Sequence, residues 1–184
     1  MIQKMDKSTY DIITRIYKNK DYDYFIQKCR ITPEFYGDIP RLAKHFCKRT
    51  EFYTQGDEPS AEFRFLYDGF SSNDFNVEYN TVLQISKPAD LFYIQHEFCI
   101  ENIDPNRMSP VLDGFDGQAY TRSQYELEEV IGDFLTKHGL RQIYYGELQE
   151  VFTELEIPGG IDLFGSQMTV ENALFRDLYE ICNV

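Results

Sequence analysis

The fold is decided by residues 61–100, which read AEFRFLYDGFSSNDFNVEYNTVLQISKPADLFYIQHEFCI. Three runs in this stretch, residues 61–67, 77–85 and 92–100, alternate between apolar and polar side chains. Side chains at every second position lie on the same face of a strand, and turn-rich segments separate the three runs. The alternation therefore predicts an antiparallel sheet of about three or more strands with one buried face.

Apolar residues recur at helical spacing before this sheet. A first helix is expected from Ser8, a candidate N-cap, to about Lys18, and a second around residues 24–29. A third is expected to begin at Asp38, whose position before an early proline suits an N-cap, and to end near Arg49. Residues 1–50 are thus expected to be helical.

After the sheet, the sequence predicts a loop followed by more helices. Residues 102–120 contain two prolines and two glycines and are expected to form a long loop. Ser123 and Glu126 have the spacing of a capping box, a second apolar stripe covers residues 148–155, and a last helix begins at Thr169. This order indicates an α+β fold, with N-terminal helices, a central antiparallel sheet and C-terminal helices packed on one face.

The length and composition predict one folded domain. The chain has 184 residues, of which 42% are apolar, enough to form a sizeable core. The expected parts are a basic helical region (1–50), the sheet (51–101), the loop (102–120) and an acidic helical region (121–184). No membrane association is expected, because the apolar runs are far shorter than the about 20 residues of a spanning helix. Four scattered cysteines are typical of reduced thiols in a cytoplasmic protein.

Charge is divided unevenly along the chain. Residues 1–50 carry 11 Lys/Arg and 6 Asp/Glu, whereas residues 51–184 carry 7 Lys/Arg and 25 Asp/Glu. The net charge of −13 would repel phosphate groups, so nucleic acid is not an expected partner despite the basic N-terminal region. A basic protein is the partner that this charge favours.

Acidic residues of the expected C-terminal helices form a candidate partner surface. Three would share one side of a first helix and three would repeat the arrangement on a second: Glu126, Glu129, Asp133, Glu147, Glu150 and Glu154. Only three cations lie between residues 120 and 160 to balance them. Two solvated helix faces are the simpler alternative. The leading hypothesis is a non-catalytic, acidic protein-binding module for a basic protein, of which an inhibitor or immunity-type protein is one concrete form.

The alternative hypothesis is an enzyme with a carboxylate site on the loop after the third strand. The candidate acid–base residues are Glu97, Glu101 and Asp104, and the candidate ligands for a divalent metal are Asp104, Asp113 and Asp116. The period of two places His96 on the opposite side from Glu97 and Glu101, which favours a hydrogen-bonded core histidine. No complete catalytic, nucleotide or metal motif is present, so no cofactor is implied, and the oligomeric state stays open.

Overall fold

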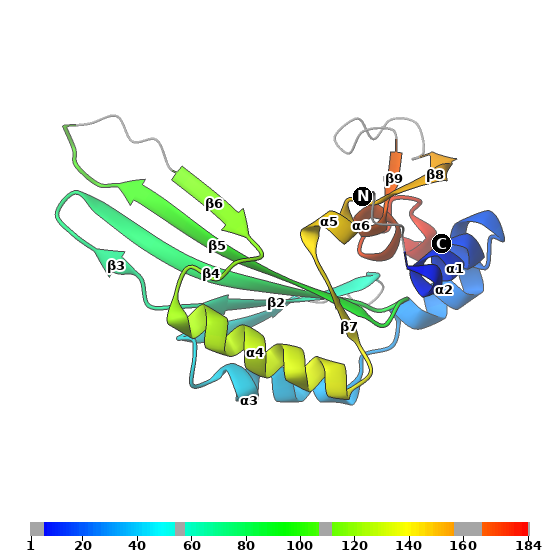
Figure 1. Cartoon of the computed structure of the whole chain (residues 1–184), viewed down its shortest axis with the longest axis horizontal. Coiled ribbons are helices and arrows are strands. Elements are labelled where there is room, and N and C mark those ends of the chain that lie inside the picture. The colour runs from blue at the N-terminus through cyan, green and yellow to red at the C-terminus, as the bar shows by residue number, and fades with distance from the viewer. Residues whose placement is uncertain (1–5, 54–57, 107–111, 157–166, 184) are drawn as a thin grey trace.

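A computed structural model describes residues 6–53, 58–106, 112–156 and 167–183. It contains helices and a seven-stranded sheet, which confirms the mixed α+β class (Figure 1). The sheet strands are β1 (Arg49–Tyr53), β2 (Ser60–Leu66), β3 (Phe70–Ser71), β4 (Phe75–Ser86), β5 (Leu91–Asn102), β6 (Leu112–Asp116) and β7 (Arg141–Ile143). A separate antiparallel pair consists of β8 (Val151–Glu156) and β9 (Gln167–Thr169).

Among the residues that the structure describes, six α-helices and three shorter helical turns surround these strands. The α-helices are α1 (Lys7–Ile13), α2 (Tyr22–Cys29), α3 (Ile39–Ala43), α4 (Arg122–Lys137), α5 (Tyr145–Leu148) and α6 (Val170–Leu174). The shorter turns are a π-helical turn (Thr14–Lys18) and two 3₁₀ helices (Glu34–Asp38 and Ile181–Asn183). Within the described ranges, no helix has the length and apolar character needed to cross a membrane.

The three alternating runs form β2, β4 and β5, as predicted. The strand order is β1-β2-β4-β5-β6, and every neighbouring pair in it is antiparallel. Two short strands extend this arrangement: β3 pairs with the first residues of β4, and β7 runs parallel to the first residues of β5. In the register, Leu83 lies opposite Phe63 on one side and Ile94 on the other, so these three side chains share a face.

That face, called the covered face below, carries the first core. Helices α3 and α4 and the 3₁₀ helix Glu34–Asp38 pack on it. Its largest fully buried side chains are Phe63, Phe65, Phe92, Ile39, Leu83, Ile85, Leu127, Ile131 and Leu135. Each such side chain stabilises the folded state by about 1.5–3 kcal/mol relative to an exposed one, so this core fixes α4 firmly against the sheet.

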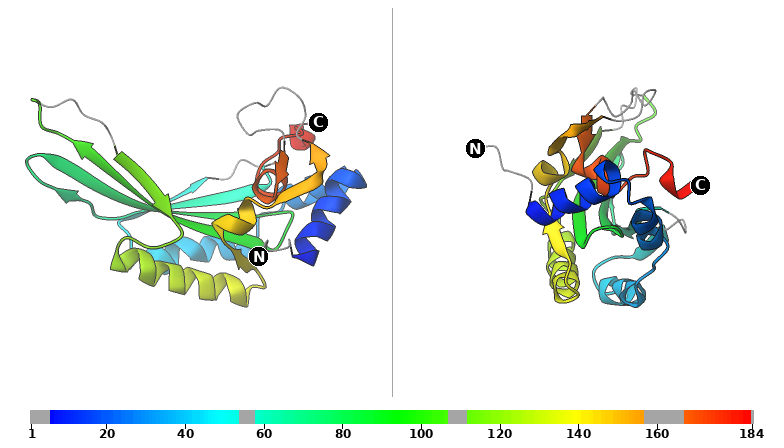
Figure 2. Two further views of the ribbon diagram at one scale, coloured as in Figure 1. Left: turned by 45° about the horizontal axis from the view of Figure 1, so that its top comes forward. Right: turned by 90° about the vertical axis from the view of Figure 1, so that its right-hand side faces the viewer.

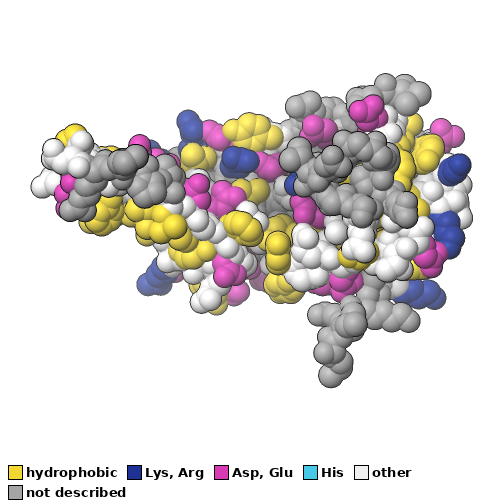
Figure 3. All heavy atoms as spheres, turned by 90° about the horizontal axis from the view of Figure 1, so that it is seen from above, with side chains coloured by type: hydrophobic (Ala, Val, Ile, Leu, Met, Phe, Trp, Pro, Cys, Tyr) yellow, Lys and Arg dark blue, Asp and Glu magenta, His cyan; other side chains and the backbone are white. Residues whose placement is uncertain are grey.

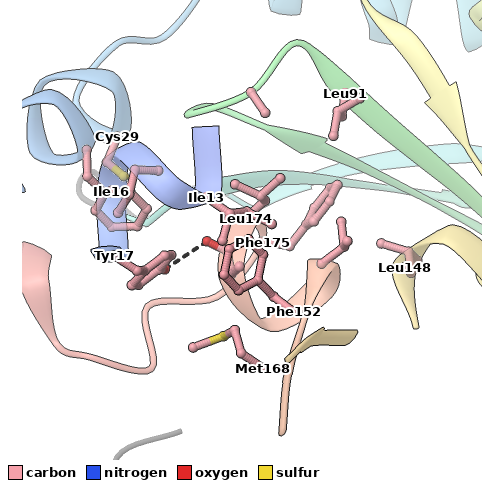
Figure 4. Packing of buried hydrophobic residues seen from close by; sticks show 14 of the residues in the cluster. Ile13, Ile16, Tyr17, Cys29, Leu91, Leu148, Phe152, Met168, Leu174 and Phe175 are labelled. Carbon is pink, nitrogen blue, oxygen red and sulfur yellow. Dashed lines mark hydrogen bonds between the residues drawn. The ribbon is translucent and has the colours of Figure 1, made fainter. Parts of the chain in front are cut away.

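A second core lies on the opposite, open face, but only near the start of β5. Leu91 and Tyr93 point to this side, where α1, α2, α5, α6, β8 and β9 form what we call the terminal unit (Figure 4). Tyr17 donates its hydroxyl hydrogen to the carbonyl of Ala173 at 2.8 Å, which joins the π-helical turn to α6. The Ser86 hydroxyl donates to the Leu174 carbonyl at 2.8 Å and joins the sheet to the same helix.

Two expectations about strands were wrong. Residues 102–120 are not all loop, because β6 supplies backbone partners for one side of the 12-residue strand β5. Residues 148–155 are not a helix. Only the end of α5 is helical there, and β8 follows, because β9 offers it backbone partners and Val151 of the supposed apolar stripe is exposed. The region 121–184 is therefore mixed.

The helices also differ from the expectations in position and in their ends. The C-terminal helices do not share one face, since α4 lies on the covered face and α6 in the terminal unit. Helix α3 ends at Ala43, and β1 begins at Arg49 within the supposed helical region. The N-cap of α1 is Asp6, two residues before Ser8, and the side chain of Asp6 accepts the Thr9 amide hydrogen.

Candidate functional site

The far end of the sheet projects beyond α4 and forms the candidate site (Figure 1). We call this part the blade: β3, β6, residues 75–80 of β4 and residues 97–102 of β5. Figure 2 shows from a second direction that the blade extends away from the body and rises on the same side of the sheet as the terminal unit. Apart from Tyr79, which packs against the first core, the blade strands present side chains on two faces beyond the two cores.

Strand parity gives the blade two chemically different faces. On the continuation of the open face lie Glu78, Glu97, Cys99, Glu101 and Asp113. On the continuation of the covered face lie Phe70, Phe75, Val77, Phe98, Ile100 and Leu112. One face is thus mainly acidic, with the exposed Phe115 opposite Glu97, and the other is mainly apolar, with Asp116 at its edge.

Cys99 lies in the middle of the acidic face, and its pKa reflects the negative charges around it. In the register it lies opposite Glu78 on β4 and Asp113 on β6. A hydrogen bond with Asp113, then burial, then the negative charges of Asp113, Glu78 and Glu101 raise the pKa of Cys99 to about 11. The thiol is therefore held protonated, because a thiolate would add another negative charge to this face.

Nearer the body, the open face is lined by amides and paired charges. Arg64 on β2 forms an ion pair with Glu62 at 2.7 Å, and the Gln95 amide donates to Glu97 at 2.8 Å. Where this face meets the terminal unit, Tyr93 and Tyr145 help to line a cavity of about 150 Å³. Figure 3 looks down on this side and shows acidic and hydrophobic side chains next to one another over the strands.

The structure separates the residues of the proposed carboxylate site. Glu97 and Glu101 share the acidic face but are four residues apart on one strand, about 13 Å along it. Two-carboxylate catalysis of glycoside hydrolysis uses carboxyl groups about 5–9.5 Å apart. Asp104 lies beyond the end of β5, and the register places Asp113 and Asp116 on opposite faces of β6. Among the residues that the structure describes, no group of three His, Cys, Asp or Glu side chains is placed to hold a metal ion.

His96 is a fully buried core residue, as the strand parity predicted. Its Nδ1 lies 2.9 Å from the Thr81 hydroxyl, and its Nε2 lies 3.1 Å from Glu128 on α4. Gln142 on β7 donates a second hydrogen bond to Glu128 at 3.1 Å. Burial alone would raise the pKa of Glu128, but the hydrogen bonds from His96 and Gln142 outweigh it and lower the pKa.

The six carboxylates of the predicted partner surface do not form one surface. Glu126, Glu129 and Asp133 lie on α4, on the covered side of the sheet, whereas Glu147, Glu150 and Glu154 lie in or beside the terminal unit. Three of the six are engaged by cations: Glu126 by Arg122 at 2.6 Å, Glu147 by Arg141 at 2.7 Å, and Glu154 by Lys18. The sequence therefore underestimated how many of these six carboxylates are paired with cations.

Sequence reasoning missed the grouping on the blade. The alternation along β5 correctly places Glu97 and Glu101 on one side, but the pairing with Glu78 and Asp113 depends on the register of β4 and β6. Comparisons with protein-family models, with curated proteins and with solved structures gave no significant match. The geometry of the blade therefore carries the functional argument by itself.

Proposed function

We propose that this chain is a non-catalytic binding module that engages a basic protein partner through the acidic face of the blade. The observation that carries the proposal is the gathering of Glu78, Glu101 and Asp113 around Cys99 on a sheet face outside both cores. Glu97 lies on the same face. An inhibitor of a cationic enzyme or toxin is one concrete form of such a module.

Two physical properties support binding over chemistry. Opposite charges on two surfaces steer their encounter and discriminate against wrong partners, and a face supported by paired strands presents its charges without reordering. In addition, the raised pKa of Cys99 disfavours the thiolate, which is the nucleophilic form of cysteine.

The proposal is tested with fluorescein-labelled decalysine as the basic probe and fluorescence anisotropy as the readout. In 20 mM NaCl, the variant Glu78→Gln/Glu101→Gln is expected to bind the probe at least about fivefold more weakly than the wild type. Binding of the wild type is expected to weaken steeply at 300 mM NaCl, because salt screens these exposed charges.

The matched control is Glu129→Gln/Asp133→Asn, which removes the same number of charges from the exposed side of α4. It is expected to bind decalysine within about twofold of the wild type, since those charges lie on the other side of the sheet. Equal weakening in both variants, or stronger weakening in the α4 variant, would overturn the assignment of the blade.

A further inference from the structure

The second face of the blade is apolar and extends beyond the first core. Phe70, Val77, Ile100 and Leu112 lie in register in one row across four strands. Phe70 and Leu112 at the two ends of the row are 56% and 59% exposed. The ring of Phe75, two residues from Val77 on the same face, lies 6.0 Å from that of Phe70.

The next row towards the body is ordered by close packing. The ring of Phe98 lies over Gly114 of β6, where a Cβ atom would come within 2.3 Å of its Cε1. Tyr120, just before α4, contacts Phe98 edge-on, with 4.9 Å between the centroids of the two rings. This row lies between the row of Phe70 and Leu112 and the core beneath α4.

A cluster of exposed apolar side chains marks an interaction site, because folded monomers rarely leave one bare. Scattered single apolar residues would carry no such meaning. Here Phe70, Phe75 and Leu112 are gathered at one end of one sheet face, on three different strands.

The charges around this surface indicate what it binds. Residues 65–120 contain nine Asp/Glu and two Lys/Arg. The cations Lys48 and Arg49 line a cavity together with Phe70. However, Lys48 is paired with Asp68 and Arg49 with Glu51. Two of the acidic residues, Asp74 in the turn between β3 and β4 and Asp116 at the end of β6, are exposed beside the apolar rows. A second copy of the chain would bring like charges together at this rim, and an anionic membrane would be repelled as well.

We propose that the apolar face of the blade binds a basic amphipathic segment of a partner protein. Apolar side chains of that segment pack on Phe70, Phe75 and Leu112, and its Lys or Arg residues meet Asp74 and Asp116. This inference rests on the proposed function, from which it takes the basic partner. It adds a second contact surface on the opposite face of the same strands.

The test compares two labelled 18-residue peptides that carry the same number of lysines in the same order. One has leucines at every third or fourth position, as on one face of a helix, and the other has serines there. Wild-type protein is expected to bind the leucine peptide at least about tenfold more tightly, because only that peptide can bury apolar area on the blade.

The variant Phe70→Ser/Leu112→Ser is expected to bind the leucine peptide no more tightly than the serine peptide, with its serine-peptide affinity unchanged. The control Ile31→Ser, which removes a side chain that is 54% exposed elsewhere, should keep the difference. Thermal unfolding by circular dichroism verifies that the variants fold, and Phe75→Ser serves as the second variant if the double one does not.

Several outcomes would overturn the inference. One is a preference for the leucine peptide that survives in the Phe70→Ser/Leu112→Ser variant. Another is a concentration-dependent dimer of the wild type that the variant abolishes in sedimentation velocity, which would make a second copy the occupant. A third is binding of the wild type to phosphatidylcholine vesicles when the Phe70→Ser/Leu112→Ser variant does not bind them. Equal binding of both peptides, weakened by Glu78→Gln/Glu101→Gln, would refute this inference alone, whereas binding of neither peptide would refute the proposed function as well.

Discussion

At the scale of single residues, His96 and Glu128 add a polar contact to the apolar packing that holds α4 on the sheet. Glu128 is the only acidic residue of α4 that hydrogen-bonds a buried side chain within the described parts of the chain. Through Thr81 and Gln142 the same network reaches β4 and β7. Because a buried polar group without a partner costs about 1–3 kcal/mol, this network favours one position of α4 over others.

The Glu128→Gln variant is expected to be less stable than the wild type by about 1–2 kcal/mol at pH 7, since a charged hydrogen-bond acceptor is replaced by a neutral one. The pKa of Glu128 is lowered in the folded state from its ordinary value of 4.5. Its stabilising contribution is therefore present above pH 4.5 and is lost as the pH falls through the folded pKa.

Urea unfolding of both proteins at pH 7 and at pH 3 measures this difference. The gap in unfolding free energy between the wild type and Glu128→Gln should narrow at the lower pH. Glu129→Gln, at the neighbouring exposed position, is the control and should match the wild type at both pH values. A gap that stays constant or widens in acid would contradict the role given to Glu128.

At the scale of elements, strands with two distinct faces can be predicted from the sequence. Short strands that form only because a partner strand is present cannot. β2, β4 and β5 each show the period of two over at least seven residues, so the local signal suffices. β6 contains Gly114, which the sequence offers as a turn signal, although its role here is to leave room for the Phe98 ring. β8 carries apolar residues at helical spacing and becomes a strand only because distant residues of β9 pair with it.

The candidate site could likewise be predicted from the sequence within one strand but not across strands. The shared side of Glu97 and Glu101 follows from parity within one strand. The addition of Glu78 and Asp113 requires the pairing of three strands, and the separation of Glu126 from Glu147 requires knowing which face each helix covers. Such long-range placements are not encoded in the spacing of neighbouring residues.

The start of α4 gives a direct test of an element boundary. Thr121 accepts the Gln124 amide hydrogen at 3.2 Å, and the Gln124 side chain accepts the Thr121 amide hydrogen at 2.9 Å. The capping box thus begins at Thr121, two residues before Ser123, the N-cap that the sequence pattern predicts. Thr121→Ala is expected to lower the unfolding free energy by about 1 kcal/mol, the usual value of an N-cap.

Ser123→Ala is the matched control, and it should change the stability by less than about 0.5 kcal/mol because Ser123 lies exposed inside the helix. Chemical denaturation of the two variants decides the matter. A larger loss for Ser123→Ala than for Thr121→Ala would place the start of the helix where the sequence pattern put it.

At the scale of the whole molecule, the charge asymmetry of the sequence is partly resolved inside the fold. Lys18 from the basic N-terminal region pairs with Glu154, and Asp6 lies 3.8 Å from Arg141. These ion pairs neutralise charge within and around the terminal unit. The stretch that contains the blade, residues 65–120, carries nine Asp/Glu and two Lys/Arg, and Lys48 and Arg49 lie beside it at β3. The blade is therefore an acidic part of the molecule that projects away from its body.

The exposed position of the blade has a consequence for local stability. Residues 82–85 of β4 lie between helices on the covered face and the terminal unit. At residues 76–79 only the covered face is packed, through Tyr79 against the first core, and the acidic face is open to solvent at Glu78. Local opening costs less where fewer apolar contacts must be broken. Amide hydrogens of residues 76–79 are therefore expected to exchange at least about tenfold faster than those of 82–85.

Hydrogen exchange followed by NMR measures both groups within one strand, which makes residues 82–85 the internal control. Adding the leucine-containing lysine peptide should slow exchange at residues 76–79 and in β6. A ligand that binds the blade only when its strands are paired stabilises the paired state against local opening. The amides of the terminal unit should keep their rates, since they lie outside both proposed contact faces. Uniform exchange along β4, or protection that appears on α4 and not on the blade, would mean that the blade is neither the less stable part of the sheet nor its binding surface.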